Sequence, residues 1–304
     1  MMIVRFSLIC LISMLIISMA ISCFATTGNS SLKYGKAKEI CKLKDNRINE
    51  SSGVAVSWRN KDAFWTNNDS GDSARIFLFK KDGETAAVVN VKGASAIDWE
   101  DIASFRLGKE CFVLIADVGD NNKVRKDYTL YLIREPVISA NTENKEALNV
   151  EAEPALTVNF IYEDGAHNCE SIAVDSTNLT VYLVSKEAGN ECKVYSMPIP
   201  KNETKEPIIA KAIVTLKLPE TTAMDISSDG MHAVILTYED TYEFVRNKNE
   251  TWAQAFSHEP CRIKMPSRRQ GESICYGTDG ETLYLTSEYE SQPLWEVPVA
   301  KKGK

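Results

Sequence analysis

Short apolar runs separated by turn residues recur along the chain, most clearly within residues 168–198. Three runs, at residues 172–174, 180–184 and 193–197, are separated by an Asp-Ser-Thr-Asn turn and a polar loop. Runs of about five residues rich in Val, Ile and Tyr, bounded by such turn residues, are typical of strands joined by hairpins. This stretch therefore predicts three consecutive antiparallel strands.

The same arrangement occurs five times, in segments 52–81, 99–136, 168–198, 224–246 and 271–299. Each of the first four copies is followed by a looser fourth strand, at residues 85–91, 156–161, 208–216 and 252–263. The last copy has none, and residues 37–43 (AKEICKL) are predicted to supply it and close a ring. A four-stranded antiparallel unit repeated around an axis is a propeller blade.

We therefore predict an all-β fold, a β-propeller of five blades closed by the N-terminal strand. Six blades are the alternative, because the interval between Ile102 and Ile172 is long enough to hold a degenerate copy. A β-sandwich also consists of many short strands, but recurrence of one internal motif favours the propeller.

The N-terminus has the pattern of an export signal. Arg5 precedes a largely apolar stretch at residues 6–21, followed by small residues. That stretch is shorter than the roughly 20 residues that span a bilayer. We predict a signal peptide at residues 1–25, cleaved after Ala25. The alternative is a lipoprotein signal in which Cys23 is acylated. A flexible segment (26–36) and a single propeller domain (37–300) would follow. The chain would be exported and secreted, periplasmic or lipid-anchored, touching a membrane only through a lipid anchor or an uncleaved signal.

Charge and cysteine content limit the functional classes. The net charge of −7 counts against nucleic-acid binding, which needs a basic face. No G-x-S-x-G, P-loop or HExxH motif is present. Six cysteines follow residue 25 and permit three disulfides in an exported chain, with Cys169 and Cys192 one candidate pair. The pair flanks one blade, although strands two places apart are roughly 10 Å distant.

Antiparallel geometry predicts where polar residues gather. The start of each first strand and the end of each second strand lie at the same end of a blade, around the axis. Aligned on the first apolar residue, the first strands open with Ser52, Glu100, Glu170, Met224 and Glu272. The second strands end in polar residues, among which we predict ligand contacts from Asp69, Asp72, Asp117, Asp120, Asn121 and Glu288.

This ring of acids has two interpretations. Carboxylates at strand ends commonly cap turns and stay solvated. Three Glu aimed at one axis would also repel each other, which raises a pKa or requires a cation. Ca²⁺ takes six to eight oxygen ligands, and we predict a Ca²⁺ site formed by Ser52, Glu100, Glu170 and Glu272.

Basic side chains also occur at the predicted rim. Lys186 and Arg269, beside Arg268, would either bind a phosphate or carboxylate of a ligand or offset the Glu charges. His167 is a candidate acid or base, and equally an ordinary loop residue.

Several longer motifs resemble a family of exported bacterial β-propeller proteins of uncharacterised function: NESSGVAVSWRN with WTNNDSGD, then DWEDIA, ADVGDNN, YLIREP, and RRQGESICYGTDG with LTSEYESQPLWEVP. The likeness covers residues 48–299 and implies a propeller and export, but no substrate. A looser likeness, in blade number and Ser/Glu openers, is to secreted calcium-activated apyrases, which hydrolyse nucleotides at an axial Ca²⁺. Met224 departs from that ring.

Two functions follow. The first is an exported propeller, expected to be a monomer, that binds a small molecule or an extracytoplasmic protein at an acidic, Ca²⁺-occupied axial face. The alternative is a Ca²⁺-dependent hydrolase of phosphoester or nucleotide-like substrates, with Lys186 and Arg269 steadying the charge. Binding is favoured because no pair of nucleophile and base can be named.

Overall fold

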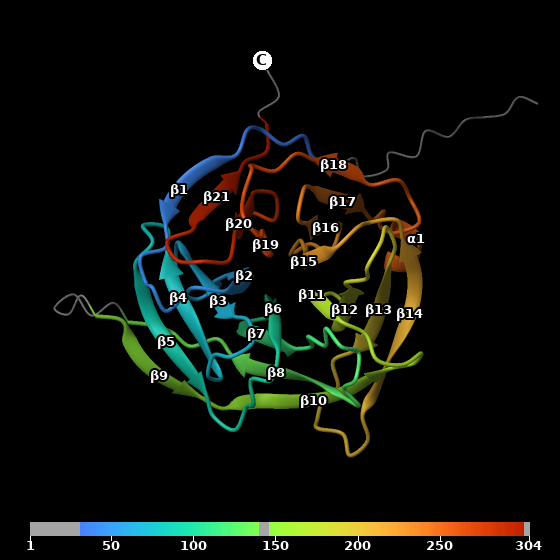
Figure 1. Ribbon diagram of the computed structural model, residues 1–304, viewed down its shortest axis with the longest axis horizontal. Coiled ribbons are helices and arrows are strands. Elements are labelled where there is room, and N and C mark those ends of the chain that lie inside the picture. The colour runs from blue at the N-terminus through green and yellow to red at the C-terminus, as the bar shows by residue number, and fades with distance from the viewer. Residues whose placement is uncertain (1–30, 140–145, 301–304) are drawn as a thin grey trace, which may run out of the picture.

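The computed structural model describes residues 31–139 and 146–300, which form a ring of β-sheets around a central axis (Figure 1). Within these residues there are 21 strands and one four-residue helix. This is the β-propeller that the sequence predicts. No helix among the described residues has the length and apolar character needed to cross a membrane. The predicted signal peptide and its Cys23 lie outside the described residues.

The first sheet has the strand order β2-β3-β4-β5-β9. Its first four strands are antiparallel neighbours, and β9 adds to the outer edge in parallel with β5. The strands are β2 (Ser51–Val56), β3 (Ala63–Asn68), β4 (Arg75–Lys80), β5 (Thr85–Val91) and β9 (Leu148–Ala152).

The second sheet is continuous over eight strands and consists of two antiparallel units joined edge to edge. The joint is a short parallel pairing between β10 and β14. The first unit is β6 (Trp99–Leu107), β7 (Glu110–Asp117), β8 (Tyr128–Arg134) and β10 (Pro154–Tyr162). The second is β11 (Cys169–Asp175), β12 (Thr180–Ser185), β13 (Cys192–Pro198) and β14 (Ile208–Leu216).

The remaining two sheets have four strands each. One is β15 (Thr221–Ile226), β16 (His232–Thr237), β17 (Thr241–Val245) and β18 (Cys261–Ile263). The other joins both ends of the domain and contains β19 (Ser273–Tyr276), β20 (Leu283–Thr286), β21 (Pro293–Val297) and β1 (Lys38–Lys42). β1 pairs antiparallel with β21, so the N-terminal strand completes the last sheet as the sequence predicts.

The first strands of the units line the axis (Figure 1). β2 contacts β6 and β19, β11 contacts β6 and β15, and β15 contacts β19, which closes a ring of neighbours. Buried hydrophobic side chains form a separate cluster at each junction between adjacent units. Dividing the eight-stranded sheet at β10–β14 gives five units, and this division is our interpretation of one continuous sheet.

Three local features differ from the sequence expectations. Residues 252–263, expected to be a strand, contain α1 (Trp252–Ala255) before the short β18. A capping box explains this helix, because Thr251 and Gln254 each hydrogen-bond the other's backbone N–H. β9 (Leu148–Ala152) is not among the strands predicted from the sequence.

The third difference lies at the N-terminus, where residues 31–36 belong to the segment predicted to be flexible. Tyr34 forms a β-bridge with Val299, and its hydroxyl donates to Glu243 Oε1 at 2.8 Å. The backbone N–H of Gly35 donates to the Pro298 carbonyl at 2.7 Å. These contacts attach the segment to the last two sheets.

No disulfide is found in the described part of the chain, where all six cysteines are free. Cys169 lies on β11 and Cys192 on β13, with β12 between them. The predicted Cys169–Cys192 bridge is therefore not formed, since strands two places apart are roughly 10 Å distant.

A buried carboxylate joins the first two units. Glu135, at the end of β8, accepts hydrogen bonds from the Ser57 hydroxyl, from Trp65 Nε1 at 2.9 Å and from the backbone N–H of Trp58 at 3.1 Å. Glu135 is only 1% exposed, so its partners would lack an acceptor without it.

We expect Glu135→Ala to lower the free energy of unfolding by roughly 2 kcal/mol or more, because it leaves several buried donors unpaired. Denaturant titration followed by fluorescence measures this. Glu110→Ala is the matched control, since that residue forms an exposed ion pair with Arg134 and should change little. Equal effects of the two substitutions would contradict the role of Glu135.

Candidate functional site

One oxygen-bearing residue stands at the axial start of every first strand. Ser52, Glu100, Glu170 and Thr222 each lie where the register with the second strand shifts, which marks a β-bulge. Glu272 directly precedes β19. Bulges re-aim side chains next to functional sites. All five residues are buried.

The sequence alignment was wrong at the fourth position. Met224 lies inside β15, opposite Ile235, and packs in a hydrophobic cluster. Thr222 occupies the equivalent position instead, and its hydroxyl donates to the Gly271 carbonyl at 2.9 Å. The small apolar Ala223, which follows Thr222, is the first apolar residue of that strand. Every unit therefore contributes an oxygen-bearing side chain.

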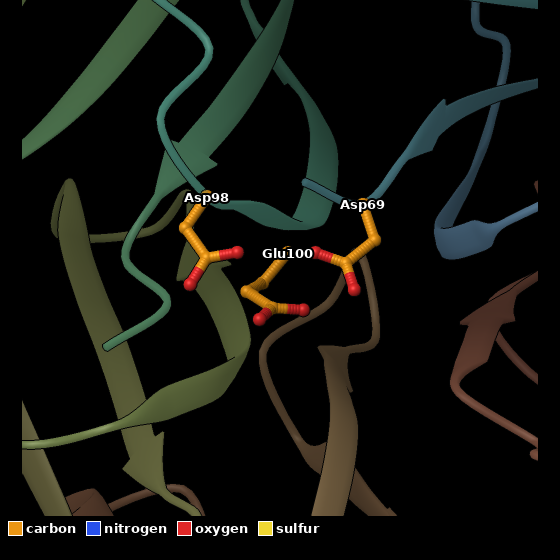
Figure 2. Close-up of side chains that lie close together, drawn as sticks. All are labelled: Asp69, Asp98 and Glu100. Carbon is orange, nitrogen blue, oxygen red and sulfur yellow. The ribbon is translucent and has the colours of Figure 1, made fainter. Parts of the chain in front are cut away.

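Three carboxylates converge beside this ring (Figure 2). One oxygen each of Asp69, Asp98 and Glu100 lies within 4.8 Å of the other two. Asp69 follows β3, Asp98 precedes β6, and Glu100 belongs to β6. Ser52 donates to Glu100 Oε2 at 2.9 Å. We call Asp69, Asp98 and Glu100 the axial acid cluster.

The axial acid cluster is compensated only from a distance, because Arg125 lowers the pKa of Asp98 and Lys186 that of Asp69 without forming ion pairs with them. Burial, with the neighbouring Asp69, raises the pKa of Asp98 to about 7. Burial also raises the pKa of Glu100 well above its ordinary value, reinforced by Glu170, Asp69 and Asp98. Among the ion pairs of the described residues, none involves a member of the cluster, so no side-chain cation neutralises it directly.

Gly119 lies against two of these carboxylates. A Cβ atom built there would be 2.4 Å from Asp98 Oδ2 and 2.6 Å from Glu100 Oε1, closer than real Cβ atoms approach other atoms. The backbone N–H groups of Val118 and Gly119 both donate to the Asp98 carbonyl at 3.1 Å. Only glycine permits this approach of the 118–119 backbone to the cluster.

The other two predicted glutamate ligands have partners of their own. Lys186 Nζ donates to Glu170 and, at 2.7 Å, to the Tyr238 hydroxyl, which donates to Glu272 Oε1 at 2.7 Å. Asn168 Nδ2 donates to Glu170 Oε1 at 3.1 Å. These contacts form a hydrogen-bonded arc from β11 to β19.

Burial and the contacts of the arc shift the pKa values of its members. Burial raises the pKa of Glu170, Lys186 opposes this, and the result is about 7. Burial lowers the pKa of Lys186, but Glu170 and Tyr238 raise it by more. Burial and the hydrogen bond with Glu272 raise the pKa of Glu288 to about 9. This raised pKa favours the protonated form of Glu288 beside Glu272 at neutral pH.

The predicted ligand contacts around the cluster are partly engaged in loop structure. Asp117 lies 2.7 Å from Arg125 Nη1. Asp120 accepts from the backbone N–H groups of Val124 and Arg125 and from Tyr128, which keeps its pKa low despite burial. A shallow hollow opens beside the cluster, lined in part by Ile97, Asp98, Gly119, Asp120, Asn121 and Arg125.

The remaining candidates lie farther from the cluster or are already bound. Asp72 pairs with Arg75 at 2.8 Å. The Arg269 guanidinium stacks over the Tyr289 ring at 3.9 Å. The ring nitrogens of His167 each lie 3.0 Å from a carboxylate oxygen, one of Glu187 and one of Asp164. His167 therefore belongs to a charged network outside the cluster.

Sequence reasoning missed Asp98, Gly119 and Thr222. Asp98 had a readable signal, because it stands two residues before Glu100 and alternate residues of an extended chain share a face. Gly119 had none, since its role comes from an approach between loops.

Comparisons with known proteins identify no family. No family model matches the chain, and no curated protein matches it. Solved structures do match. One is a gluconolactonase from Xanthomonas campestris, which is 11% identical, with a TM-score of 0.43, covering 91% of this chain and 99% of that one.

Glu288 gives this site a testable pH dependence. Its pKa in the folded protein, about 9, lies above the ordinary value of 4.5. A raised carboxyl pKa stabilises the fold below the ordinary value, and this contribution is lost as pH rises through the folded value. We expect chelator-treated wild type to lose stability relative to Glu288→Gln between about pH 4.5 and pH 9, because the amide keeps the hydrogen bond and does not ionise. Thermal melts across this range measure the difference, and parallel profiles would contradict it.

Proposed function

We propose that this protein is an exported β-propeller that binds Ca²⁺ at the axial acid cluster and uses this face to hold a small molecule or an extracytoplasmic protein. The observation that carries the proposal is the convergence of Asp69, Asp98 and Glu100 without a side-chain cation among them. Buried carboxylates this close are stable only when protonated or bound to a cation. The N-terminal residue pattern supports export.

The donor set fits a hard cation. All nearby donors are oxygens, from carboxylates and from the Ser52 hydroxyl, and no His or Cys belongs to the cluster. Ca²⁺ accepts such ligands in flexible geometry, and Asp69 and Asp98 come from connecting segments rather than strands. Waters would complete the shell.

This assignment moves the predicted ion toward β2 and β6. Glu100 and Ser52 keep their predicted roles, while Asp69 and Asp98 take the places first given to Glu170 and Glu272. The latter two are hydrogen-bonded to Lys186 and Tyr238, and would act on the cation through their charge rather than as ligands.

The alternative is a Ca²⁺-dependent hydrolase of phosphoester or nucleotide-like substrates. The hollow that shares Asp98 with the cluster favours it, because a ligand there would lie next to the cation. A bound divalent cation would polarise a phosphoryl oxygen. Binding remains the better-supported function, because Lys186 is paired with Glu170 and Arg269 with Tyr289.

The cation is tested by titrating Ca²⁺ into the chelator-stripped mature protein in a calorimeter. We expect saturable binding that weakens by roughly tenfold or more in Asp98→Asn and Glu100→Gln, since even indirect partners of metal ligands cost that much. Glu151→Gln, which removes an exposed charge paired with Lys92 on the outer edge, is the control and should bind as wild type does. Absence of binding heat, or equal binding by all variants, would overturn the site.

The same variants should separate two effects on stability. Without Ca²⁺, Asp98→Asn should melt at a higher temperature than wild type, because one of three repelling carboxylates is gone. With Ca²⁺, wild type should gain stability by mass action and the variant should gain less at the same Ca²⁺ concentration. A Ca²⁺-induced rise in melting temperature that is the same in both proteins would contradict the assignment of Asp98.

Hydrolysis is tested with phosphomonoester, phosphodiester and nucleotide substrates, with and without Ca²⁺. Ca²⁺-dependent turnover that disappears in Asp98→Asn would replace the binding function by the hydrolase. Inactivity on all three classes, together with intact Ca²⁺ binding, would leave the binding function standing.

A further inference from the structure

The opposite end of the axis carries a second hollow region. The first strands that begin at the acid cluster end there, and a pocket is lined by residues from the ends of all five, such as Val56, Phe105, Val174, Ile226 and Tyr276. A wider pocket lies between the first and last sheets. The two share Val56, Trp58 and Gly277, so they form one depression, which we call the distal groove.

Three cationic side chains line the distal groove without an acidic partner. Arg59 and Lys61 line the wider pocket, and Arg106 lines the axial one. All three are exposed. None of them belongs to an ion pair in the described residues. Lys81, which also lines the groove, lies near Glu296 at 3.6 Å and donates to Tyr284.

The acidic residues of the groove are mostly engaged by the backbone. Asp225 accepts from the backbone N–H groups of Ile226 and Tyr276, both at 2.8 Å. Asp279 accepts from the backbone N–H of Thr282 at 2.9 Å and from the Thr282 hydroxyl. The third, Asp62, lies in a left-handed turn with φ 54°. None of these three acids forms an ion pair with Arg59, Lys61 or Arg106 among the described residues.

An aromatic platform lies between these cations. The Arg106 guanidinium stacks over the Trp58 ring at 4.3 Å, and no hydrogen bond of its N–H groups is found among the described residues. Trp58 lines both pockets of the distal groove, so its side chain forms part of the groove wall.

Hydrogen bonds to the neighbouring unit fix the backbone of the loop that contains Trp58 and Arg59. Glu135 accepts from the backbone N–H groups of Trp58, at 3.1 Å, and Arg59, at 3.3 Å. Asn60 donates to the Pro136 carbonyl at 3.1 Å. Because its backbone is fixed, a ligand would lose little free energy in ordering this loop.

We propose that the distal groove is a second binding site, for an organic anion in which a carboxylate, sulfonate or phosphate is joined to an apolar or aromatic body. The anionic group would accept from Arg106, with Arg59 and Lys61 adding charge attraction. The body would pack on the Trp58 ring and on the apolar side chains at the strand ends. This site lies on the face opposite the axial acid cluster and does not depend on the cation.

The test uses 8-anilinonaphthalene-1-sulfonate, an aromatic body with one sulfonate, and N-phenyl-1-naphthylamine, which has the same body without charge. Binding of each is followed by its fluorescence in the presence of chelator. We expect saturable binding of the sulfonate that weakens by roughly tenfold in Arg106→Gln and measurably in Lys61→Gln, since a charge-assisted hydrogen bond is lost. The neutral analogue should bind these variants as it binds wild type.

Arg47→Gln is the matched control, because it removes an exposed cation that is paired with Asp45 outside the groove. It should leave sulfonate binding unchanged, and melting temperatures equal to that of wild type would show that every variant is folded. Unchanged sulfonate binding by both groove variants would overturn the site. An equal loss for the neutral analogue, or no saturation up to roughly 1 mM probe, would do so too.

Discussion

Like charges crowd the axis because the first strands of all units begin there, and each unit brings an oxygen-bearing side chain to the same place. The protein compensates this repulsion in two ways. From β11 to β19, Lys186 and Tyr238 connect Glu170 and Glu272 into a hydrogen-bonded arc, and the raised pKa of Glu288 favours its protonated form. Among the described residues, no ion pair reaches Asp69, Asp98 or Glu100, and burial together with the neighbouring carboxylates raises the pKa of Asp98 and of Glu100. This difference distinguishes one sector of an otherwise regular ring.

The architecture was readable from the sequence because each unit repeats the same strand and turn pattern, and because residues 37–43 lacked any partner other than the last unit. The sequence predictions failed for residues 252–263 and for β9. Residues 252–263 were predicted to be a strand, but a capping box at Thr251 begins a helix there. This local signal was present in the sequence and was overlooked. β9 could not be foreseen, since its pairing with β5 joins segments that are distant in sequence.

Antiparallel strand geometry predicted only part of the candidate site. That geometry correctly brought Ser52, Glu100, Glu170 and Glu272 to the axis, but apolar alignment replaced Thr222 by Met224. It could not tell which acids have cationic partners, because the Lys186–Tyr238 connection crosses from β12 to the loop after β16. The distal groove could not be predicted from the sequence, because it forms where two sheets and the ends of five strands meet.

The pairing of β1 with β21 has a consequence for how the chain reaches its final form. β1 is the first strand of the domain, and its partner β21 is the last strand to be synthesised. The edge of β1 therefore stays unpaired with β21 until then. A partly synthesised chain can form individual hairpins, but it cannot complete the circle. Such long-range closure slows folding and leaves strand edges open to wrong partners in the interval. The ring of the propeller can therefore close only after β21 has been made.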